Sequence, residues 1–126
     1  MDFDWSNYLR IAKDIETSGN KDEALLRTAV SRAYYSAINL AAKNAQEKHK
    51  HPPFSSKNFH SDVISFYTSD MNNPNYYLAG KLLRTLHTSR GKCDYDASFT
   101  GDLEKLLGSS IIQAENIKSE LAKKTY

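Results

Sequence analysis

The chain has 126 residues, of which 40% are hydrophobic and 25% charged, and its formal net charge is +2. This length allows one hydrophobic core and is too short for two ordinary domains, so we expect a single domain over residues 1–126. Because Cys93 is the single cysteine, an intrachain disulfide is excluded. No stretch approaches the roughly 18 consecutive apolar residues of a membrane span. The acidic start MDFDW is unlike a secretory signal, and these features together favour a cytoplasmic protein.

Two helices are predicted over residues 4–17 and 21–48. Asp4 is the expected N-cap of the first helix, and Asn20 followed three residues later by Glu23 predicts a capping box at the start of the second. The apolar face of the first helix consists of Trp5, Tyr8, Leu9, Ala12 and Ile15. Because only a short connection separates the two helices, we expect them to be antiparallel neighbours.

The long helix over 21–48 contains neither glycine nor proline and is predicted to have an apolar and a polar face. Alanines at four-residue intervals predict close packing against neighbouring helices. The predicted buried face consists of Leu26, Ala29, Val30, Ala33, Tyr34, Ala37 and Ala41, and the predicted polar face consists of Thr28, Arg32, Tyr35, Ser36, Asn39 and Lys43. A tyrosine within a polar face suggests contact with a partner subunit or a ligand, although plain solvent exposure is the alternative. Candidate ligand- or RNA-binding residues on this helix are Arg32, Tyr35, Asn39 and Lys43.

The loop predicted over 48–57 contains two prolines and is locally basic. Its lysines are either a solvated surface or a patch that contacts phosphate groups beside a nucleic-acid site. Three histidines in and near the loop, His49, His51 and His60, do not match the usual spacing of zinc ligands. We therefore predict no metal site and no cofactor.

Three further helices are predicted over residues 58–69, 75–92 and 101–123, the last with Thr100 as its N-cap. Their inward faces consist of Phe59, Val63, Phe66 and Tyr67 in the third helix, of Tyr76, Ala79, Leu83, Leu86 and Arg90 in the fourth, and of Leu103, Leu107, Ile111, Ala114, Ile117 and Leu121 in the fifth. No segment has the pattern of a β-strand. The sequence therefore predicts an all-α, up-and-down bundle of four to five helices.

Arg90 is unusual because it falls on the leucine stripe of the fourth helix, where an inward cation needs partners. Asp94 lies four residues further on, which is the spacing of a helical ion pair, and Tyr95 follows it. One interpretation is a salt bridge that pins the loop after the helix. The other is a positively charged cluster, joined by Arg32, that binds a phosphate group. Cys93 is interpreted as a partly buried apolar residue rather than a nucleophile.

The segments SRAYYSAINLAA at 31–42 and SRGKCDYD at 89–96 together resemble the HEPN family, named from higher eukaryotes and prokaryotes nucleotide binding. The resemblance is to the small stand-alone prokaryotic branch, which carries an RAYY segment on its second helix and an Arg-x-x-Ala-Asp-Tyr segment at the end of its fourth. It implies an HEPN-like helical bundle, often a homodimer, and a frequent role in toxin–antitoxin or phage-defence systems with a nucleotidyltransferase partner. We accordingly expect a two-fold homodimer whose interface lies close to the second and fourth helices.

Catalytic members of this family cut RNA without a metal, using an arginine followed four to six residues later by a histidine. No histidine follows Arg90 here, and Asn39 stands where relatives often have a histidine. Three functions remain open: a module that binds RNA, a nucleotide or a partner protein; an RNA-cleaving toxin in which Tyr95, His87 or a lysine replaces the histidine; and a purely structural adaptor. The candidate catalytic residues are Arg90, Asp94 and Tyr95.

Overall fold

The chain folds into five α-helices joined by short turns and loops, and the computed structural model describes residues 2–123. The helices are α1 (Ser6–Ser18), α2 (Glu23–Lys48), α3 (Phe59–Thr68), α4 (Pro74–Tyr95) and α5 (Leu103–Ala122). No strand occurs among the described residues, so the predicted all-α bundle is confirmed. The predicted domain also includes residues 1 and 124–126, which lie outside this range.

The helix boundaries agree with the predicted ones to within two residues, except that α4 ends three residues later than expected, at Tyr95. Asp94 therefore belongs to the last turn of α4, where the helical spacing brings its carboxylate to the side of Arg90. Within residues 2–123, none of the helices combines the length and apolar character that crossing a membrane would require.

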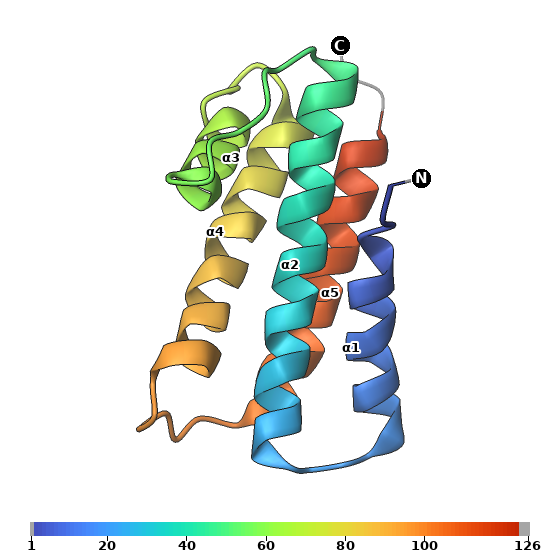
Figure 1. Cartoon of the computed structure of the whole chain (residues 1–126), viewed down its shortest axis with the longest axis vertical. Helices are drawn as coiled ribbons and strands as arrows, with labels where there is room; N and C mark the ends of the chain where they lie inside the picture. The colour runs from blue at the N-terminus through green and yellow to red at the C-terminus, as the bar shows by residue number, and fades with distance from the viewer. Residues whose placement is uncertain (1, 124–126) are drawn as a thin grey trace.

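Helices α1, α2, α4 and α5 run up and down beside one another, and the short α3 packs against α4 at one side (Figure 1). The long α2 contacts all four other helices. Close approach of α3 depends on Gly80, because a Cβ atom there would lie 2.6 Å from the methyl group of Thr68 and 2.8 Å from its backbone nitrogen. A side chain at position 80 would thus push α3, and the residues it carries, away from α4.

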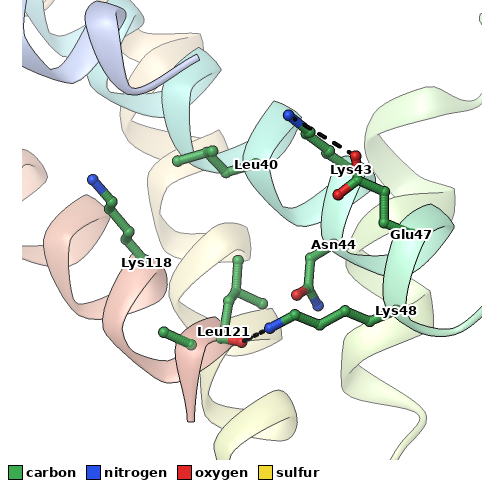
Figure 2. Close-up of a pocket in the computed structure, with 8 residues that line it drawn as sticks. Leu40, Lys43, Asn44, Glu47, Lys48, Lys118 and Leu121 are labelled. Carbon is green, nitrogen blue, oxygen red and sulfur yellow. Dashed lines mark hydrogen bonds and ion pairs between the residues drawn. The ribbon is translucent and has the colours of Figure 1, made fainter. Parts of the chain in front are cut away.

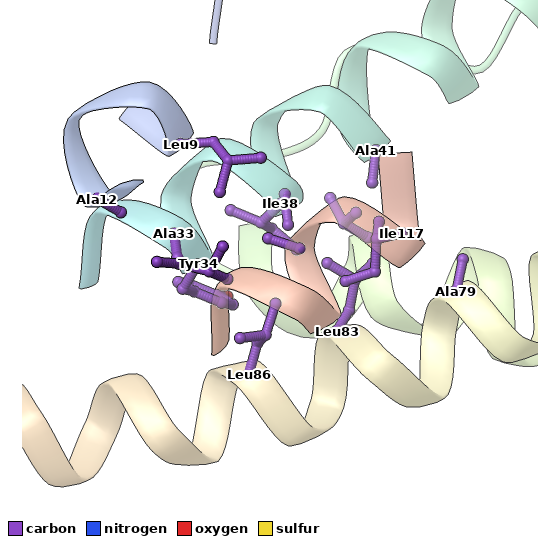
Figure 3. Packing of buried hydrophobic residues seen from close by; sticks show 14 of the residues in the cluster. Leu9, Ala12, Ala33, Tyr34, Ile38, Ala41, Ala79, Leu83, Leu86 and Ile117 are labelled. Atoms are coloured by element: carbon purple, nitrogen blue, oxygen red, sulfur yellow. The ribbon is translucent and has the colours of Figure 1, made fainter. Parts of the chain in front are cut away.

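The core is centred on α2 and draws on the inward faces of its neighbours (Figure 3). All seven residues of the predicted buried face of α2 are buried, but the prediction that Ser36 lies on a polar face is wrong, because Ser36 is 0% exposed. Ile38, Ala42 and Ala45 are buried as well. A central helix that is packed on several sides has a wider buried face than the pattern predicted, and Ser36 falls within it, whereas Thr28, Arg32, Tyr35, Asn39 and Lys43 are not buried.

The N-cap of α2 differs from the predicted one. Asp22 occupies the cap position, and its Oδ1 accepts the backbone N–H of Leu25 at 3.0 Å. The side chain of Asn20 instead accepts the N–H of Asp22 at 2.9 Å, so the expected capping box between Asn20 and Glu23 does not form. A carboxylate next to the helix start satisfies an orphan N–H and also interacts favourably with the helix dipole, which explains why Asp22 is preferred.

Two further caps also differ in position. Asp102 rather than Thr100 caps α5, where its Oδ1 accepts the N–H of Lys105 at 3.1 Å. Asp4 accepts a backbone N–H near the start of α1, but Trp5 occupies the N-cap position itself. The capping residue of α5 lies two positions from the predicted one, and sequence alone does not separate such neighbours. At the start of α1, Trp5 makes no side-chain capping bond, and Asp4 lies one residue before the N-cap position.

Candidate functional site

Tyr34 joins three helices through its buried hydroxyl group. It projects from the buried face of α2, and its oxygen lies 2.5 Å from Nδ1 of His60 on α3 and 3.0 Å from Nδ1 of His87 on α4. The centroids of the two imidazole rings are 5.3 Å apart. The side chain of Tyr34 is 0% exposed, whereas both histidines are half-buried. One hydroxyl group therefore holds two histidines close together at the edge of the core.

Arg90 lies one helical turn after His87 on α4 and is 5% exposed. Its Cζ atom lies 5.3 Å from the ring centroid of Tyr34, 5.6 Å from that of Tyr35 and 5.4 Å from that of Tyr95. A guanidinium within about 6 Å of an aromatic face gains about 0.5–2 kcal/mol from the ring quadrupole. Three tyrosine rings thus surround the cation and partly compensate for its removal from water.

The polar partners of Arg90 are few. Its Nη1 donates to the hydroxyl of Tyr95 at 3.1 Å and lies 3.5 Å from the carboxylate of Asp94, while its buried Nε has no hydrogen-bond partner among residues 2–123. Within the same range Asp94 is the one carboxylate paired with Arg90, and it also accepts a bond from Ser31 at 3.3 Å. Because this ion pair is long, Asp94 neutralises the cation incompletely.

Burial and the arginine together set the protonation states of this cluster. Burial lowers the pKa of His60 and of His87 below the usual 6.5, and the positive charge of Arg90 lowers both further. Burial raises the pKa of the Tyr34 hydroxyl well above its usual 10. At neutral pH the cluster therefore contains two neutral imidazoles and a protonated phenol.

A pocket of about 330 Å³ opens beside the two histidines. Its lining consists of Lys57, Asn58, His60, Ser61, Ile64, Ser65, Arg84 and His87, and no carboxylate is among them. Neither Lys57 nor Arg84 forms an ion pair with another residue of the range 2–123. The pocket is thus lined by two unpaired cations, two imidazoles and several hydrogen-bond donors, which is a suitable environment for a phosphate group.

The structure brings together four of the predicted site residues. Arg90, Asp94 and Tyr95 contact one another, and Tyr35 packs on Arg90 from α2. Arg32 does not join this cluster within the chain, because its guanidinium lies over the ring of Tyr8 on α1, 4.8 Å from the centroid. Two residues correspond to about 200° of rotation around a helix, so Arg32 and Tyr34 point to different sides of α2.

Asn39 and Lys43 lie further along α2. The amide of Asn39 donates to the backbone carbonyl of Tyr35 at 2.8 Å, which occupies it within the helix. Lys43 is 3.9 Å from Glu47 and lines a second pocket, of about 260 Å³, between α2 and the end of α5 (Figure 2). Nine residues of helix separate Lys43 from Tyr34, or roughly 13 Å along the axis. The second pocket is therefore a different site.

A second tyrosine–histidine network lies nearer the C-terminal end of α2. The hydroxyl of Tyr76 lies 2.7 Å from Nε2 of His49 and accepts from the amide of Asn44 at 2.9 Å. The same amide donates to the hydroxyl of Tyr67 at 3.0 Å, and Tyr67 donates to the carbonyl of Ala41 at 2.6 Å. These bonds tie α2 to α3, to α4 and to the loop that begins at His49.

Sequence reasoning treated Tyr34 as a core residue, considered His60 only as a metal ligand and mentioned His87 only as a substitute for a missing histidine. The available signal was the three-residue spacing of His87 and Arg90, which places both on one side of α4. Among residues 2–123, no group of three or more histidine, cysteine or acidic side chains is arranged to hold a metal ion. Cys93 is buried, and burial raises the pKa of its thiol, which agrees with the apolar interpretation.

Comparison of the chain with protein-family models, with curated proteins and with solved structures gives no match in any of the three.

Proposed function

We propose that the protein binds RNA or nucleotide phosphates at the pocket beside His60 and His87, as the nucleic-acid-binding component of a toxin–antitoxin or phage-defence system. The observation that carries the proposal is the lining of this pocket, in which Lys57 and Arg84 form no ion pair with a carboxylate of residues 2–123. Arg90 adds a third cation behind the imidazole rings. The biological setting rests on the resemblance of residues 31–42 and 89–96 to the HEPN family.

Phosphate is the ligand class that this chemistry favours. Arginine and lysine side chains supply charge-assisted hydrogen bonds to phosphate oxygens, and the serines and the asparagine of the pocket supply neutral donors. Net charge alone would not predict this preference, because the whole chain carries only +2. The local separation of cations from carboxylates is what favours a polyanion at this position.

Metal-independent RNA cleavage is the second candidate function, favoured by the paired imidazoles. Attack of a ribose 2′-hydroxyl on the adjacent phosphate needs one group that accepts a proton and one that donates a proton to the leaving oxygen. His60 and His87, with ring centroids 5.3 Å apart, supply two such groups beside a cation. In this mechanism His87 and His60 take the place of the histidine that the sequence lacks after Arg90, while Asp94 and Tyr95 hold the arginine.

Assembly is part of the same proposal. A two-fold homodimer with its interface near α2 and α4 would cover the ring of Tyr95, which is 78% exposed at the end of α4. A nucleotidyltransferase antitoxin encoded nearby is the expected regulatory partner. Light scattering at tens of micromolar protein tests the dimer, and a monomer at that concentration would count against it.

The binding proposal is tested by titrating a fluorescent single-stranded RNA oligonucleotide into the purified full chain. The double variant Lys57→Ala/Arg84→Ala should bind at least about tenfold more weakly and should lower the slope of log affinity against log salt by about 1–2. The matched control is Lys43→Ala/Lys118→Ala, which removes two cations from the second pocket of Figure 2.

That control variant should keep the affinity of the wild-type chain to within about twofold, since its lysines lie outside the proposed site. Equal losses in both double variants would mean that the RNA responds only to overall charge. A wild-type chain that binds no RNA or nucleotide would leave the structural adaptor as the better interpretation of Arg90.

A further inference from the structure

We infer that Tyr34 links His60 and His87 into a charge-neutral proton relay, in which the two histidines hold opposite tautomers and serve as the base and the acid of one reaction. The inference rests on the proposed function for its substrate class, an RNA phosphodiester. It goes further by assigning Tyr34, a fully buried residue, as the group that positions both protons.

The single proton of the shared hydroxyl excludes two bare Nδ1 atoms bonded to it, and opposite tautomers are the arrangement in which that proton also has an acceptor. The oxygen of Tyr34 lies within hydrogen-bond distance of Nδ1 on both rings, and a tyrosine has only one hydroxyl proton. It can donate that proton to one Nδ1, which must then be bare, and it can accept from the other, which must then carry a proton. Arg90, the charged group packed against the ring of Tyr34, is only a donor and cannot accept the hydroxyl proton instead.

Opposite states at Nδ1 imply opposite states at Nε2, because a neutral imidazole carries one N–H. The histidine that donates to Tyr34 has a bare Nε2 and can act as a base. The histidine that accepts from Tyr34 has an Nε2–H and can act as an acid. Both rings line the same pocket, and Nε2 is in each ring the nitrogen that is not bonded to Tyr34. The pocket is therefore supplied with one proton acceptor and one proton donor.

The relay balances without forming a charged imidazole. The base takes the 2′-hydroxyl proton at Nε2, the 2′-oxygen bonds to phosphorus, and the bond from phosphorus to the 5′-oxygen breaks. The leaving 5′-oxygen takes the Nε2 proton of the acid, whose Nδ1 then receives the hydroxyl proton of Tyr34, while Tyr34 receives the Nδ1 proton of the base. The products are a 2′,3′-cyclic phosphate and a 5′-hydroxyl end, and both histidines are again neutral with their roles exchanged.

A neutral relay suits the charges around the cluster. The groups that face the two imidazoles are the phenols of Tyr34 and Tyr35 on α2, the arginines Arg84 and Arg90 on α4, and Lys57 before α3. None of these is an acid that would stabilise an imidazolium, and Arg90 opposes one. A conventional acid–base pair needs one protonated histidine, which this environment disfavours, whereas the relay needs none.

The tautomers are observable directly in the wild-type chain. Long-range ¹⁵N–¹H correlation spectra at pH 7.5 should show one of His60 and His87 protonated at Nδ1 and the other at Nε2, with the signals assigned by their loss in His60→Asn and His87→Asn. Two histidines in the same tautomer, or an imidazolium at this pH, would overturn the relay. This measurement requires neither RNA nor activity.

A pair of matched variants tests the catalytic consequence. Tyr34→Phe keeps the aromatic ring and removes the shared hydroxyl, so the complementary tautomers should disappear. The rate of RNA cleavage in the presence of EDTA should fall by about 10²-fold or more, because acid–base catalysis contributes about 10²–10⁴-fold. RNA affinity should stay within about twofold of the wild-type value. Tyr76→Phe makes the same deletion in the second network and should change neither the tautomers of His60 and His87 nor the rate.

The outcomes separate the relay from the proposed function. Opposite tautomers in a chain that binds no RNA would refute the proposed function and leave the relay standing. Tight RNA binding with identical tautomers would refute the relay and leave the proposed function standing. Opposite tautomers and RNA binding without any cleavage, or undiminished cleavage in Tyr34→Phe, would overturn the assignment of the relay to acid–base catalysis. An equal loss of rate in Tyr76→Phe would assign the effect to folding.

Discussion

Two tyrosines of this bundle, Tyr34 and Tyr76, each bond to histidine, but their surroundings differ. Tyr76 bonds to one histidine and to Asn44, whose amide can only donate to the tyrosine oxygens. Tyr34 bonds to two histidines that can each donate or accept. In the Tyr76 network the protons have little freedom of position. In the Tyr34 network the protons have two possible patterns, which differ by a proton shift. The same residue types thus make a structural tie in one place and a candidate reactive site in the other.

Charge strengthens the contrast. The Tyr76 network has no cation among its bonded groups, whereas the Tyr34 ring packs on Arg90, whose Nε is unpaired. Buried polar groups without partners are costly, so proteins retain them mainly where a ligand can complete them. Among residues 2–123, the Tyr34 network thus differs from the Tyr76 network in having a cation with an unpaired nitrogen against it.

The largest expected effect on stability comes from breaking the Tyr76 network. Asn44→Ala removes two hydrogen bonds to buried tyrosine hydroxyls, so the free energy of unfolding should fall by about 2–3 kcal/mol. Urea denaturation followed by circular dichroism measures the change. RNA affinity should be unaltered, because Asn44 is not part of the histidine pocket. A loss of affinity at unchanged stability would contradict the division into a structural and a functional network.

Arg90→Lys tests the other network and should reduce RNA affinity by about tenfold, because lysine keeps the charge and loses the planar fork. Its melting temperature should remain close to the wild-type value, because lysine keeps the positive charge that pairs with Asp94 and packs against the tyrosine rings. A thermal melt paired with the RNA titration gives both quantities. A stable variant with undiminished binding would remove Arg90 from the site.

Arg27 is the matched control for this variant. Its Nη1 donates to the carbonyls of Lys92 at 3.2 Å, Cys93 at 3.0 Å and Asp96 at 3.0 Å, and so it caps the C-terminal end of α4. Arg27→Lys loses the planar fork by which Nη1 bonds these carbonyls while Nε and Nη2 bond Glu23, so it should lower the melting temperature and leave RNA binding unchanged. If Arg90→Lys behaved like Arg27→Lys, Arg90 would be a structural pin.

The smallest expected effect is a pH dependence that arises from the Tyr34 network. The pKa values of His60 and His87 are lowered in the folded chain, so below about pH 6.5 the unfolded chain binds more protons than the folded one. The free energy of unfolding should therefore fall as the pH falls from about 6.5 toward the lowered pKa values, and the stabilisation should be complete above that range. Denaturation series between pH 5 and pH 8, about the range where histidine titrates, measure the slope.

The double variant His60→Asn/His87→Asn should show a flatter dependence than the wild-type chain. A double variant that kept the full wild-type slope would mean that the pH dependence arises from groups other than His60 and His87.

The sequence by itself determined the five helices and most of their inward faces, because side-chain periodicity reports which side of a helix is apolar. It also placed Asp94 beside Arg90, since both lie on one helix four residues apart and helical geometry brings them together. The sequence did not determine which residues cap α2 and α5. Asp22 lies two positions from the predicted cap Asn20, and Asp102 lies two positions from the predicted cap Thr100.

Only the tertiary structure decided the candidate site. Tyr34 is 26 residues from His60 and 53 from His87, and no periodicity relates positions on three different helices. Their meeting depends on how α3 docks on α4 at Gly80 and on the rotation of α2 between its neighbours. The packing of α2 likewise buried Ser36 and turned Arg32 toward Tyr8. Helical periodicity determines which residues share a side of one helix, whereas the packing of the helices against one another determines which sides meet.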